Sequence, residues 1–599
     1  MMKTQLLVVG GGPAGLCGAI EASRYGVETL IVDEGVELGG QLVKQTHKFF
    51  GHEGFFASMR GFEIARRLKN QLNHHVKVML QTTVVGIYED VVVLYSREKD
   101  HTFEVRADYI LLATGASERF IQFENNHLPG VYGAGAVQTL MNQFMVLPGK
   151  RFLMIGSGNI GLIVSYQLLQ AGAEVAAIVE IVDRVGGYDV HLRKIKRFGV
   201  PVLLRHTIKK ALGEEKVTGA VVVQVDEKFR PIEGTEKEFA VDVICIATGL
   251  TPSVELAAMA NVKIEYVPEL GGFVPYRDQN MRTNVENIFI AGDLAGIEEA
   301  TTAMIEGRIA GLTIAQSVVG VDISKEIEAL QNELVEFRSG PFSEKVRKGL
   351  SRFFPQRTVG FSRQPQTDKG PMGKLRPIIE CYENIPCNPC QTSCPAGAIE
   401  VPGNINSLPR IDYERCTGCG ICVSKCPGLA IFMVQENIEP GFDLVVIPYE
   451  MVPLPGKNER VIALDREGKE VCEAQVVKVL RFPDMTNLIY LKVPAGYSDR
   501  VRNFRTVKRG NVLVCRCEEV TLEEVERAIE LGFTDYEELR RYLRIGMGMC
   551  GGRTCRNTVL SILSQKLGKS SEELLKGRFR PPVMPVKFES ILRGESNEE

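Results

Sequence analysis

The sequence has few of the features that mark membrane, secreted or nucleic-acid-binding proteins. No apolar run approaches the roughly 18 residues that cross a bilayer, and the opening MMKTQLLVVGGGPAG lacks a signal-peptide layout. Net charge is only −3, from 71 basic and 74 acidic side chains, which argues against a nucleic-acid-binding body or a polybasic membrane surface. We therefore expect a cytoplasmic protein with no transmembrane segment and no nucleic-acid partner, and 599 residues predict about three to five domains.

Cysteine is nearly missing from the front of the chain, and histidine is missing from the rear. Only Cys17 and Cys245 of the 15 cysteines precede residue 380, whereas all eight histidines lie between His47 and His206. This segregation excludes Cys/His zinc fingers and Rieske-type ligation in the C-terminal half, because no imidazole is available there. A disulfide scaffold is disfavoured in a long chain without an export signal. Thiolate-bound metal is the remaining class, whereas Cys17 and Cys245 are expected to be inert core residues.

A glycine fingerprint directly follows the first apolar strand, LLVV. In Gly10-x-Gly12-x-x-Gly15 the first glycine permits a tight turn, the second lets a pyrophosphate approach the backbone, and the third lets helix and strand pack closely. Asp33, or Glu34 after it, ends the second strand where a ribose-binding carboxylate is expected. The pattern predicts a dinucleotide-binding unit.

A second copy of the fingerprint follows the strand RFLMI. It reads Gly156-x-Gly158-x-x-Gly161, and Glu180 takes the acidic position after the next strand. A carboxylate there favours a free 2′-hydroxyl and therefore NAD(H) over NADP(H). Arg184 lies nearby and leaves NADP(H) open, and Glu180 could also be a solvated charge at a strand end.

Turns of small residues follow three further apolar strands, and they make the prediction from the two fingerprints more specific. These turns lie in LLATGAS, in CIATGLTP and at the end of TNVENIFIAGD. With the two fingerprints, they resemble the two-dinucleotide flavoproteins, which include thioredoxin reductase and the NADH-dependent flavin oxidoreductases. The resemblance implies an α/β, Rossmann-like fold with a discontinuous FAD-binding domain, 1–120 and 250–322, and an inserted NAD(P)-binding domain, 121–249. No close cysteine pair precedes residue 381, which disfavours a disulfide reductase.

Two segments narrow the resemblance. GGQLVKQTHKFFG (39–51) and 113–138 are similar to the nucleotide-binding subunits of heteromeric amino-acid dehydrogenases and oxidases, of the sarcosine oxidase alpha, dye-linked proline dehydrogenase and hydrogen cyanide synthase type. His47 could carry a proton near a flavin, although a surface or core-capping role is favoured. The resemblance implies FAD contacts at Gly10, Gly12, Pro13, Ala14, Gly15, Asp33, Glu34, Gly40, Gln41, Ala113, Thr114, Gly115, Gly292 and Asp293, and NAD contacts at Gly156, Gly158, Gly161, Glu180 and Gly249.

The strongest local signal is a ferredoxin-type cysteine motif, Cys416-x2-Cys419-x2-Cys422-x3-Cys426-Pro427. In such a motif three thiolates hold one cubane cluster and the fourth, before proline, reaches the neighbouring cluster. An upstream copy is offset by 32 residues, but asparagine stands at position 384 where its first cysteine is expected. We therefore predict one [4Fe–4S] cluster on Cys381, Cys387, Cys390 and Cys426, and another on Cys416, Cys419, Cys422 and Cys394.

The region 381–431 resembles a two-cluster bacterial ferredoxin. Because Cys381 is displaced from the expected position, the first cluster could also be a three-iron or labile cluster. A pair of structural zinc sites is the alternative interpretation of these cysteines. Before it, 323–380 is expected to be a helical, basic linker, for which a docking site for acidic ferredoxin is a less favoured interpretation. After it, 432–508 alternates short apolar runs with turns, which predicts a small β module with a structural Cys472.

A last cysteine group predicts a third cluster. It comprises Cys515, Cys517, Cys550 and Cys555, and Thr521 and Glu524 form a capping-box pattern between the two pairs. The segment 509–582 resembles the bacterioferritin-associated ferredoxin, a helical [2Fe–2S] module, and 583–599 is expected to be a tail. A four-thiolate zinc site is the alternative.

The combination implies an electron-transferring FAD-dependent iron–sulfur oxidoreductase, as one subunit of a hetero-oligomer. By resemblance, a second FAD-containing dehydrogenase subunit would oxidise an amino or imino acid, a 2-hydroxy acid or glycerol 3-phosphate, and electrons would pass through FAD, NAD(H) and three clusters. A stand-alone NAD(P)H oxidoreductase for ferredoxin or another acceptor, and a redox-sensing or iron-handling protein, are the other hypotheses. No acid–base or nucleophile pattern is recognisable, so no catalytic residue is assigned.

Overall fold

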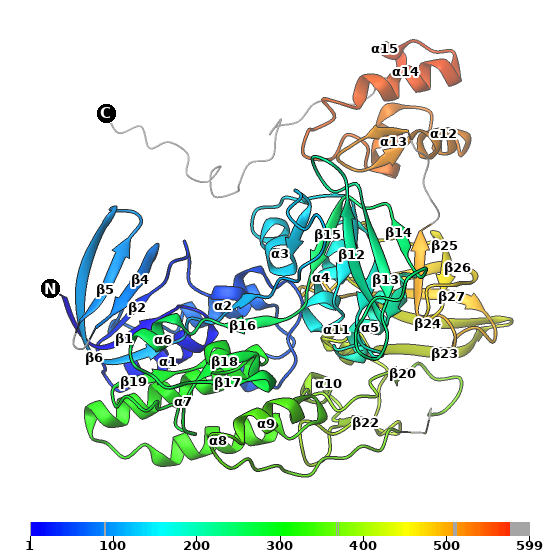
Figure 1. Ribbon diagram of the computed structural model, residues 1–599. Helices are drawn as coiled ribbons and strands as arrows, with labels where there is room; N and C mark the ends of the chain where they lie inside the picture. Colours follow the sequence, from blue (N-terminus) through cyan, green and yellow to red (C-terminus); the bar gives the residue numbers. More distant parts are fainter. Residues whose placement is uncertain (1, 89–90, 367, 369, 507–511, 575–599) are drawn as a thin grey trace, which may run out of the picture. The chain divides into compact units, whose positions relative to one another are not determined.

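The computed structural model describes residues 2–88, 91–366, 368, 370–506 and 512–574 (Figure 1). The chain divides into two compact units, Met1–Arg505 and Thr506–Glu599, which are described separately. Among the described residues, no helix combines the length and the apolar character needed to span a membrane.

The first part of unit 1 is a seven-stranded sheet in the order β3-β2-β1-β6-β5-β4, with β19 beside β6. Its central strands are parallel and apolar on both faces, as expected of a sheet covered on both sides. Figure 1 shows that α1 and α7, far apart in the sequence, lie side by side next to this sheet. The elements are β1 (Met2–Val9), α1 (Pro13–Arg24), β2 (Thr29–Val32), α2 (Gly61–Lys69), β3 (Val76–Met79), β4 (Thr82–Ile87), β5 (Val92–Ser96), β6 (His101–Leu112), β19 (Ile288–Ile290) and α7 (Ala300–Val319).

Glycine lets the two helices touch. A Cβ on Gly307 of α7 would lie 2.1 Å from the carbonyl oxygen of Ala14, and one on Gly311 would lie 2.3 Å from that of Gly18. Real Cβ atoms do not approach that closely, so only glycine permits this helix contact. Cys17 lies in the same core and burial raises the pKa of its thiol to about 12.

The second part is a parallel sheet in the order β11-β10-β9-β15-β8, with α3, α4 and α5 beside it. A three-stranded antiparallel sheet, β12-β13-β14, and the two-stranded β7–β16 and β17–β18 complete the dinucleotide-binding half. The elements are β7 (Ala116–Glu118), β8 (Val131–Gly133), α3 (Ala134–Asn142), β9 (Arg151–Ile155), α4 (Asn159–Gln170), β10 (Glu174–Glu180), α5 (Asp189–Lys196), β11 (Val202–Leu204), β12 (His206–Leu212), β13 (Gly219–Gln224), β14 (Lys237–Phe239), β15 (Val243–Ile246), β16 (Leu250–Pro252), α6 (Glu255–Met259), β17 (Ile264–Val267) and β18 (Gly272–Pro275).

The third part carries the ferredoxin-type cysteines beside an antiparallel sheet in the order β20-β23-β24-β27-β26-β25-β28. Strand β20 comes from the predicted basic linker and pairs with β23, so the two strands that flank the cysteine segment belong to the sheet of the predicted β module. The elements are α8 (Ser324–Arg338), α9 (Glu344–Leu350), β20 (Arg376–Ile379), α10 (Pro389–Thr392), β21 (Ile399–Glu400), β22 (Arg410–Ile411), α11 (Ile421–Lys425), β23 (Ile431–Glu439), β24 (Phe442–Tyr449), β25 (Arg460–Leu464), β26 (Glu470–Leu480), β27 (Asn487–Pro494) and β28 (Asn503–Thr506).

Unit 2 is helical apart from the short pair β29–β30. The Thr521 side chain caps α12, and the backbone amide of Thr521 donates to the Glu524 carboxylate at 2.9 Å. These contacts confirm the predicted capping box. The elements are β29 (Leu513–Cys515), β30 (Val520–Thr521), α12 (Leu522–Glu530), α13 (Tyr536–Leu543), α14 (Arg556–Leu567) and α15 (Ser571–Leu574). The predicted tail, 583–599, and the end of the predicted domain before it, 575–582, lie outside the described residues.

Candidate cofactor sites

One cavity of about 2050 Å³ runs along both glycine fingerprints in unit 1. Most of the predicted dinucleotide contacts line it, although they come from segments up to 280 positions apart. Gly15 and Gly161 do not line the cavity. A Cβ on Gly15 would lie 1.9 Å from the carbonyl oxygen of Gly10, and one on Gly161 would lie 2.3 Å from that of Gly156. These two glycines therefore let each helix pack closely on the turn that precedes it. The predicted residues that line the cavity are Gly10, Gly12, Pro13, Ala14, Asp33, Glu34, Gly40, Gln41, Ala113, Thr114, Gly115, Gly156, Gly158, Glu180, Gly249, Gly292 and Asp293.

The two fingerprints are built alike. Gly10 has φ +101° and Gly156 has φ +106°, and a Cβ on them would lie 2.4 Å from Ala113 O and 2.3 Å from Ala247 O. Each Ala-Thr-Gly turn therefore packs on the first glycine of a fingerprint. This contact explains why both turns accompany the fingerprints in the sequence.

The middle glycines leave room for a ligand. A Cβ on Gly158 would meet no atom within 4 Å, and one on Gly12 would meet only the Cα of Gly40 at 4.0 Å. Both glycines are N-cap residues, of α4 and α1, and have no side chain to cover the first helix amides. Each fingerprint therefore fits a dinucleotide whose phosphates face the N-terminus of the helix that follows it.

The acidic residues after the second strand of each half are held by the fingerprint loops. Asp33 accepts hydrogen bonds from the amides of Gly11 at 2.6 Å and Gly35 at 2.7 Å. Glu180 accepts from the amide of Ser157 at 2.9 Å and from its hydroxyl at 2.6 Å. Both carboxylates thus stand at the cavity wall, where a ribose can compete for them.

Asp293 is the buried carboxyl of the Gly-Asp segment. Burial, together with the neighbouring Glu298 and Glu306, raises its pKa to about 7, although a backbone hydrogen bond from Glu298 opposes the rise. A ligand that donates hydrogen bonds here would stabilise the charged carboxylate.

A wall of aromatic side chains separates this cavity from the cysteines. Phe50, Tyr188 and His191 line the cavity, and their rings make edge and stacked contacts at 5.3–6.2 Å. His47 also lines it, stacked on Phe49. Burial lowers the pKa of His47 to about 3, so its imidazole is neutral, and its Nδ1 has no hydrogen-bond partner among the described residues. His47 is therefore a half-buried residue of the cavity wall that packs on the core residue Phe49.

The inner cysteine set, Cys381, Cys387, Cys390 and Cys426, lies directly behind this wall. Phe50 and three of these cysteines pack on a buried cluster that includes Tyr188. Burial, together with the thiols of Cys390, Cys426 and Cys381, raises the pKa of Cys387, and a backbone hydrogen bond from Gly51 opposes the rise. The structure therefore groups these four thiols, including the displaced Cys381.

The outer cysteine set comprises Cys394, Cys416, Cys419 and Cys422. Burial, together with the thiols of Cys419, Cys416 and Cys394, raises the pKa of Cys422 to about 12. Cys426 adds a smaller effect, so the two sets adjoin. Cys419 is exposed at the surface, whereas none of the inner thiols is.

The 32-residue repeat is visible in matching amide–sulfur contacts. The amide of Ala398 donates to Cys394 Sγ at 3.3 Å, and the amide of Ala430 donates to Cys426 Sγ at 3.4 Å. Such bonds stabilise the negative charge of a cluster thiolate. No group of three or more His, Cys, Asp or Glu side chains among the described residues has the arrangement for a single metal ion. Both four-thiol donor sets fit [4Fe–4S] clusters in chemistry and number.

Unit 2 gathers its own four cysteines. The backbone amide of Thr554, then the thiol of Cys517 and the amide of Gly552, lower the pKa of Cys550 to about 7. Cys515 and burial raise the pKa of Cys555 to about 12. Four adjacent thiols served by backbone amides fit a [2Fe–2S] cluster.

The family model named pyridine nucleotide-disulphide oxidoreductase matches residues 4–307, about half of the chain. The chain belongs to this family. A 4Fe–4S binding domain matches residues 409–432, and a BFD-like [2Fe–2S] binding domain matches residues 513–565. The chain is therefore a flavin and iron–sulfur oxidoreductase, which confirms the predicted fold class and enzyme class.

Relatives of this oxidoreductase confirm the predicted resemblance. Hydrogen cyanide synthase subunit HcnB of Pseudomonas aeruginosa is 26% identical over 445 residues, 71% of this chain and 92% of that protein. Sarcosine oxidase subunit alpha of Corynebacterium sp. (strain P-1) is 28% identical over 345 residues, which cover 55% of this chain but only 34% of that subunit. Among solved structures, L-proline dehydrogenase from P. horikoshii aligns with a TM-score of 0.45 and 18% identity, over 98% of this chain and 79% of that one.

Sequence reasoning missed the residues that connect the cavity of this oxidoreductase to its cysteines. Phe50 and Gly51 end the 39–51 segment but were given no role there, Tyr188 lies outside every motif, and Lys48 contacts the loop of Cys426. The one available signal was the apolar, aromatic end of the 39–51 segment, which has no periodicity of its own.

Proposed function

We propose that this chain is the electron-transferring subunit of a heteromeric dehydrogenase and relays electrons between a substrate-oxidising flavoprotein, its own FAD and NAD(H), and three clusters. FAD would occupy the first fingerprint and Gly292-Asp293, and NAD(H) the second fingerprint. The inner and outer sets would each hold a [4Fe–4S] cluster, and the four cysteines of unit 2 a [2Fe–2S] cluster. The domain boundaries that the sequence predicts are part of this proposal.

The observation that carries the proposal is the shared wall between the cavity and the inner cysteine set. Flavin accepts two electrons and can release them singly, whereas each cluster carries one. Phe50 and Tyr188 line the cavity and also belong to the packed cluster that includes Cys387. The outer set continues the route to the exposed Cys419. The described chain thus supports a path from a flavin to the protein surface.

The partner follows from the relatives rather than from the geometry. Three of the matched proteins are named as subunits: hydrogen cyanide synthase HcnB, sarcosine oxidase alpha and opine oxidase A. We infer by analogy that this chain also works with a second flavoprotein, which oxidises an amino or imino acid, a 2-hydroxy acid or glycerol 3-phosphate.

A stand-alone NAD(P)H oxidoreductase is the second candidate. One continuous cavity joins both fingerprints, so a nicotinamide and a flavin can share it. An NADH oxidase of Methanocaldococcus jannaschii is also a relative, 25% identical over 52% of this chain and 69% of that protein.

Anaerobic purification from the native host with cofactor, metal and subunit analysis tests both candidates. We expect about ten iron atoms per chain from two cubanes and one two-iron cluster, one FAD, and co-purification with a second flavoprotein whose substrate bleaches the clusters. Rapid bleaching by NADH without a partner, followed by reduction of ferredoxin, would instead establish the stand-alone enzyme. A colourless, zinc-rich preparation would overturn both.

A further inference from the structure

The loop that carries Cys426 is surrounded by buried cations from distant parts of the chain. Lys48 Nζ donates to the carbonyl oxygen of Ser424 at 2.5 Å, and Arg197 Nη1 donates to that of Leu429 at 3.0 Å. Lys194 Nζ lies 3.4 Å from the carbonyl oxygen of Pro427. The three cationic residues are only 2%, 4% and 5% exposed for Lys48, Lys194 and Arg197.

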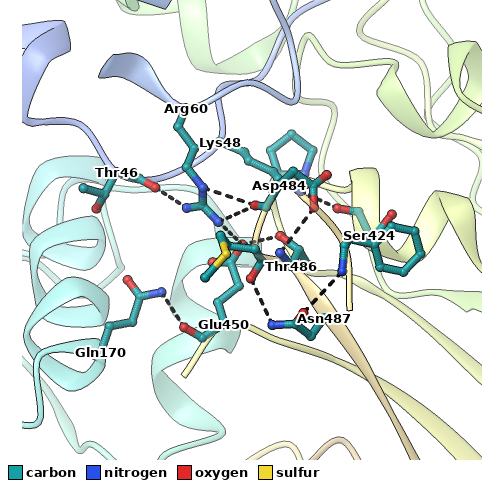
Figure 2. A network of polar contacts seen from close by, with 12 residues as sticks. Thr46, Lys48, Arg60, Gln170, Ser424, Glu450, Asp484, Thr486 and Asn487 are labelled. Carbon is teal, nitrogen blue, oxygen red and sulfur yellow. Dashed lines mark hydrogen bonds and ion pairs between the residues drawn. The ribbon is translucent and has the colours of Figure 1, made fainter. Parts of the chain in front are cut away.

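Lys48 stands in a polar network that joins four segments of unit 1 (Figure 2). It pairs with Asp484 at 3.0 Å, and Arg60 donates to the carbonyl oxygen of Asp484 at 2.9 Å and to Glu450 at 3.1 Å. Gln170 of α4 donates to the carbonyl oxygen of Glu450 at 3.2 Å. The network therefore fixes the Lys48 side chain at the Cys426 loop from several sides.

Positive charge exceeds negative charge around this loop. The charged side chains that contact the loop or this network include five cations and three carboxylates: Lys48, Arg60, Lys194, Arg197 and Lys425, with Glu63, Glu450 and Asp484. Lys48 and Lys194 contact backbone carbonyl oxygens on either side of Cys426, at Ser424 and Pro427. Both buried charges therefore lie beside the backbone that carries the Cys426 thiol.

A structural clamp alone does not require charge. Burying an ammonium group is costly, and a neutral donor could satisfy the same carbonyl oxygens. A cluster with four thiolates is anionic and gains one more negative charge on reduction, so a buried cation stabilises its reduced form more than its oxidised form.

We propose that Lys48 and Lys194 are positioning residues that raise the reduction potential of the cluster on the inner cysteine set. Lys48 lies in the segment 39–51, which belongs to the first dinucleotide-binding part, and Lys194 lies in α5, which belongs to the second. The reduction potential of this cluster therefore depends on the packing of both parts against the Cys426 loop. The inference rests on the proposed function, since it requires a cluster at Cys426.

An EPR-monitored redox titration of the purified, cluster-loaded full chain tests the proposal. In Lys48→Met the reduced-to-oxidised ratio of one [4Fe–4S] cluster should fall about tenfold at the wild-type midpoint, which equals about 59 mV for one electron. The other [4Fe–4S] cluster should keep its midpoint. Lys48→Arg, which retains the charge, should restore the ratio to within about twofold.

Lys425 offers a matched control. It binds the same Asp484 oxygen at 2.9 Å, but its side chain is 38% exposed, so solvent screens its charge. Lys425→Met should shift the ratio by no more than about twofold. Iron content, measured on each variant, separates a shifted cluster from a lost one.

Every result of this redox titration either supports or overturns the inference. Lys48→Met with full iron content and an unchanged midpoint would overturn the inference, as would an equal shift in Lys48→Met and Lys48→Arg. If Lys48→Met loses iron, Lys194→Met carries the same test, and an unchanged midpoint there overturns the inference. A wild-type chain without a reducible [4Fe–4S] cluster would overturn the proposed function instead.

Discussion

The inner and outer cysteine sets share one sequence repeat but differ in what surrounds them. The inner set is enclosed by residues from far away in the sequence: Phe50 and Gly51 from the segment before α2, and Tyr188 before α5. The outer set packs mainly on nearby strands, and a Cβ on Gly420 would lie 3.0 Å from Leu488 of β27. Only the outer set presents an exposed thiol, Cys419, among the described ferredoxin-type cysteines.

The difference assigns separate tasks to two similar motifs. Burial and nearby cations fix the potential of a cluster, whereas exposure lets it exchange electrons with another protein. In the proposed relay, an inner set beside the cavity and an outer set with an exposed thiol would place two clusters in series between the flavin and the protein surface. A duplicated motif thus acquires polarity from its packing rather than from its ligands.

Serine substitution at one thiol of each set gives the largest expected effect. Cys387→Ser and Cys419→Ser should each cost one cluster, about four iron atoms. Only Cys387→Ser should abolish the reduction of the remaining cubane by the flavin, because it removes the cluster next to the cavity. Rapid-mixing absorbance of the flavin and clusters after substrate addition measures this step.

The two variants control for each other, because both lose the same amount of iron. Reduction of the remaining cluster at the wild-type rate in Cys387→Ser would show that electrons bypass the inner set. Loss of that step in Cys419→Ser as well would show that the two sets do not act in sequence.

A smaller effect is expected where α5 packs on the Cys426 loop. A Cβ on Gly428 would lie 2.9 Å from Cβ of Val190, and both atoms are fixed by the backbone. Gly428→Ala should therefore push α5 away and cost roughly 1–3 kcal/mol of stability. Hydrogen–deuterium exchange should show faster exchange of the α5 amides.

Gly360 provides the control, because a Cβ there would meet no atom within 4 Å and its φ is not positive. Gly360→Ala should leave α5 exchange unchanged. Equal exchange in Gly428→Ala and wild type would mean that the inner set is not held by the second dinucleotide-binding sheet.

The sequence predicted the features that depend on local spacing. Both fingerprints, both Ala-Thr-Gly turns and three cysteine groups follow from short motifs whose chemistry fixes residue type and interval. The family, the fold class and the iron–sulfur classes are confirmed. The cluster ligands and the dinucleotide contacts stay predictions, and the grouping of the inner and outer thiols supports them.

The features that the sequence left out depend on contacts between distant segments. Lys48 lies 376 positions from Ser424, and neither the 39–51 segment nor the cysteine motif indicates that the two residues meet. Strand β20 is only four residues long and lies in a basic, proline-containing stretch, so its pairing with β23 could not be seen from periodicity. His47 was expected at the surface or capping the core because a lone histidine gives no sign of its surroundings. Packing over long sequence distances determined all three.

The smallest expected effect concerns the outer side of the sheet. Arg376 of β20 donates to both carboxylate oxygens of Glu436, at 2.6 Å and 2.7 Å. The preceding residue, Leu375, lies against Gly418 in the loop of the outer set. The Arg376 hydrogen bonds lower the pKa of Glu436 from 4.5 to about 2. A carboxylate with a lowered folded-state pKa stabilises the fold fully above its unfolded-state pKa, and this contribution disappears as pH falls through the folded-state pKa.

Glu436→Gln should therefore cost about 1–2 kcal/mol at pH 7, after allowance for its partial exposure. In urea unfolding, the difference from wild type should stay constant from pH 7 to about 5.5 and shrink below about 4.5. Glu439→Gln is the matched control on the same strand, because its partner Lys492 is 3.3 Å away and its side chain is 57% exposed, so we expect less than about 0.5 kcal/mol. Equal losses in both variants would show that solvent screens the β20–β23 ion pair too, and that the outer set gains no anchor from it.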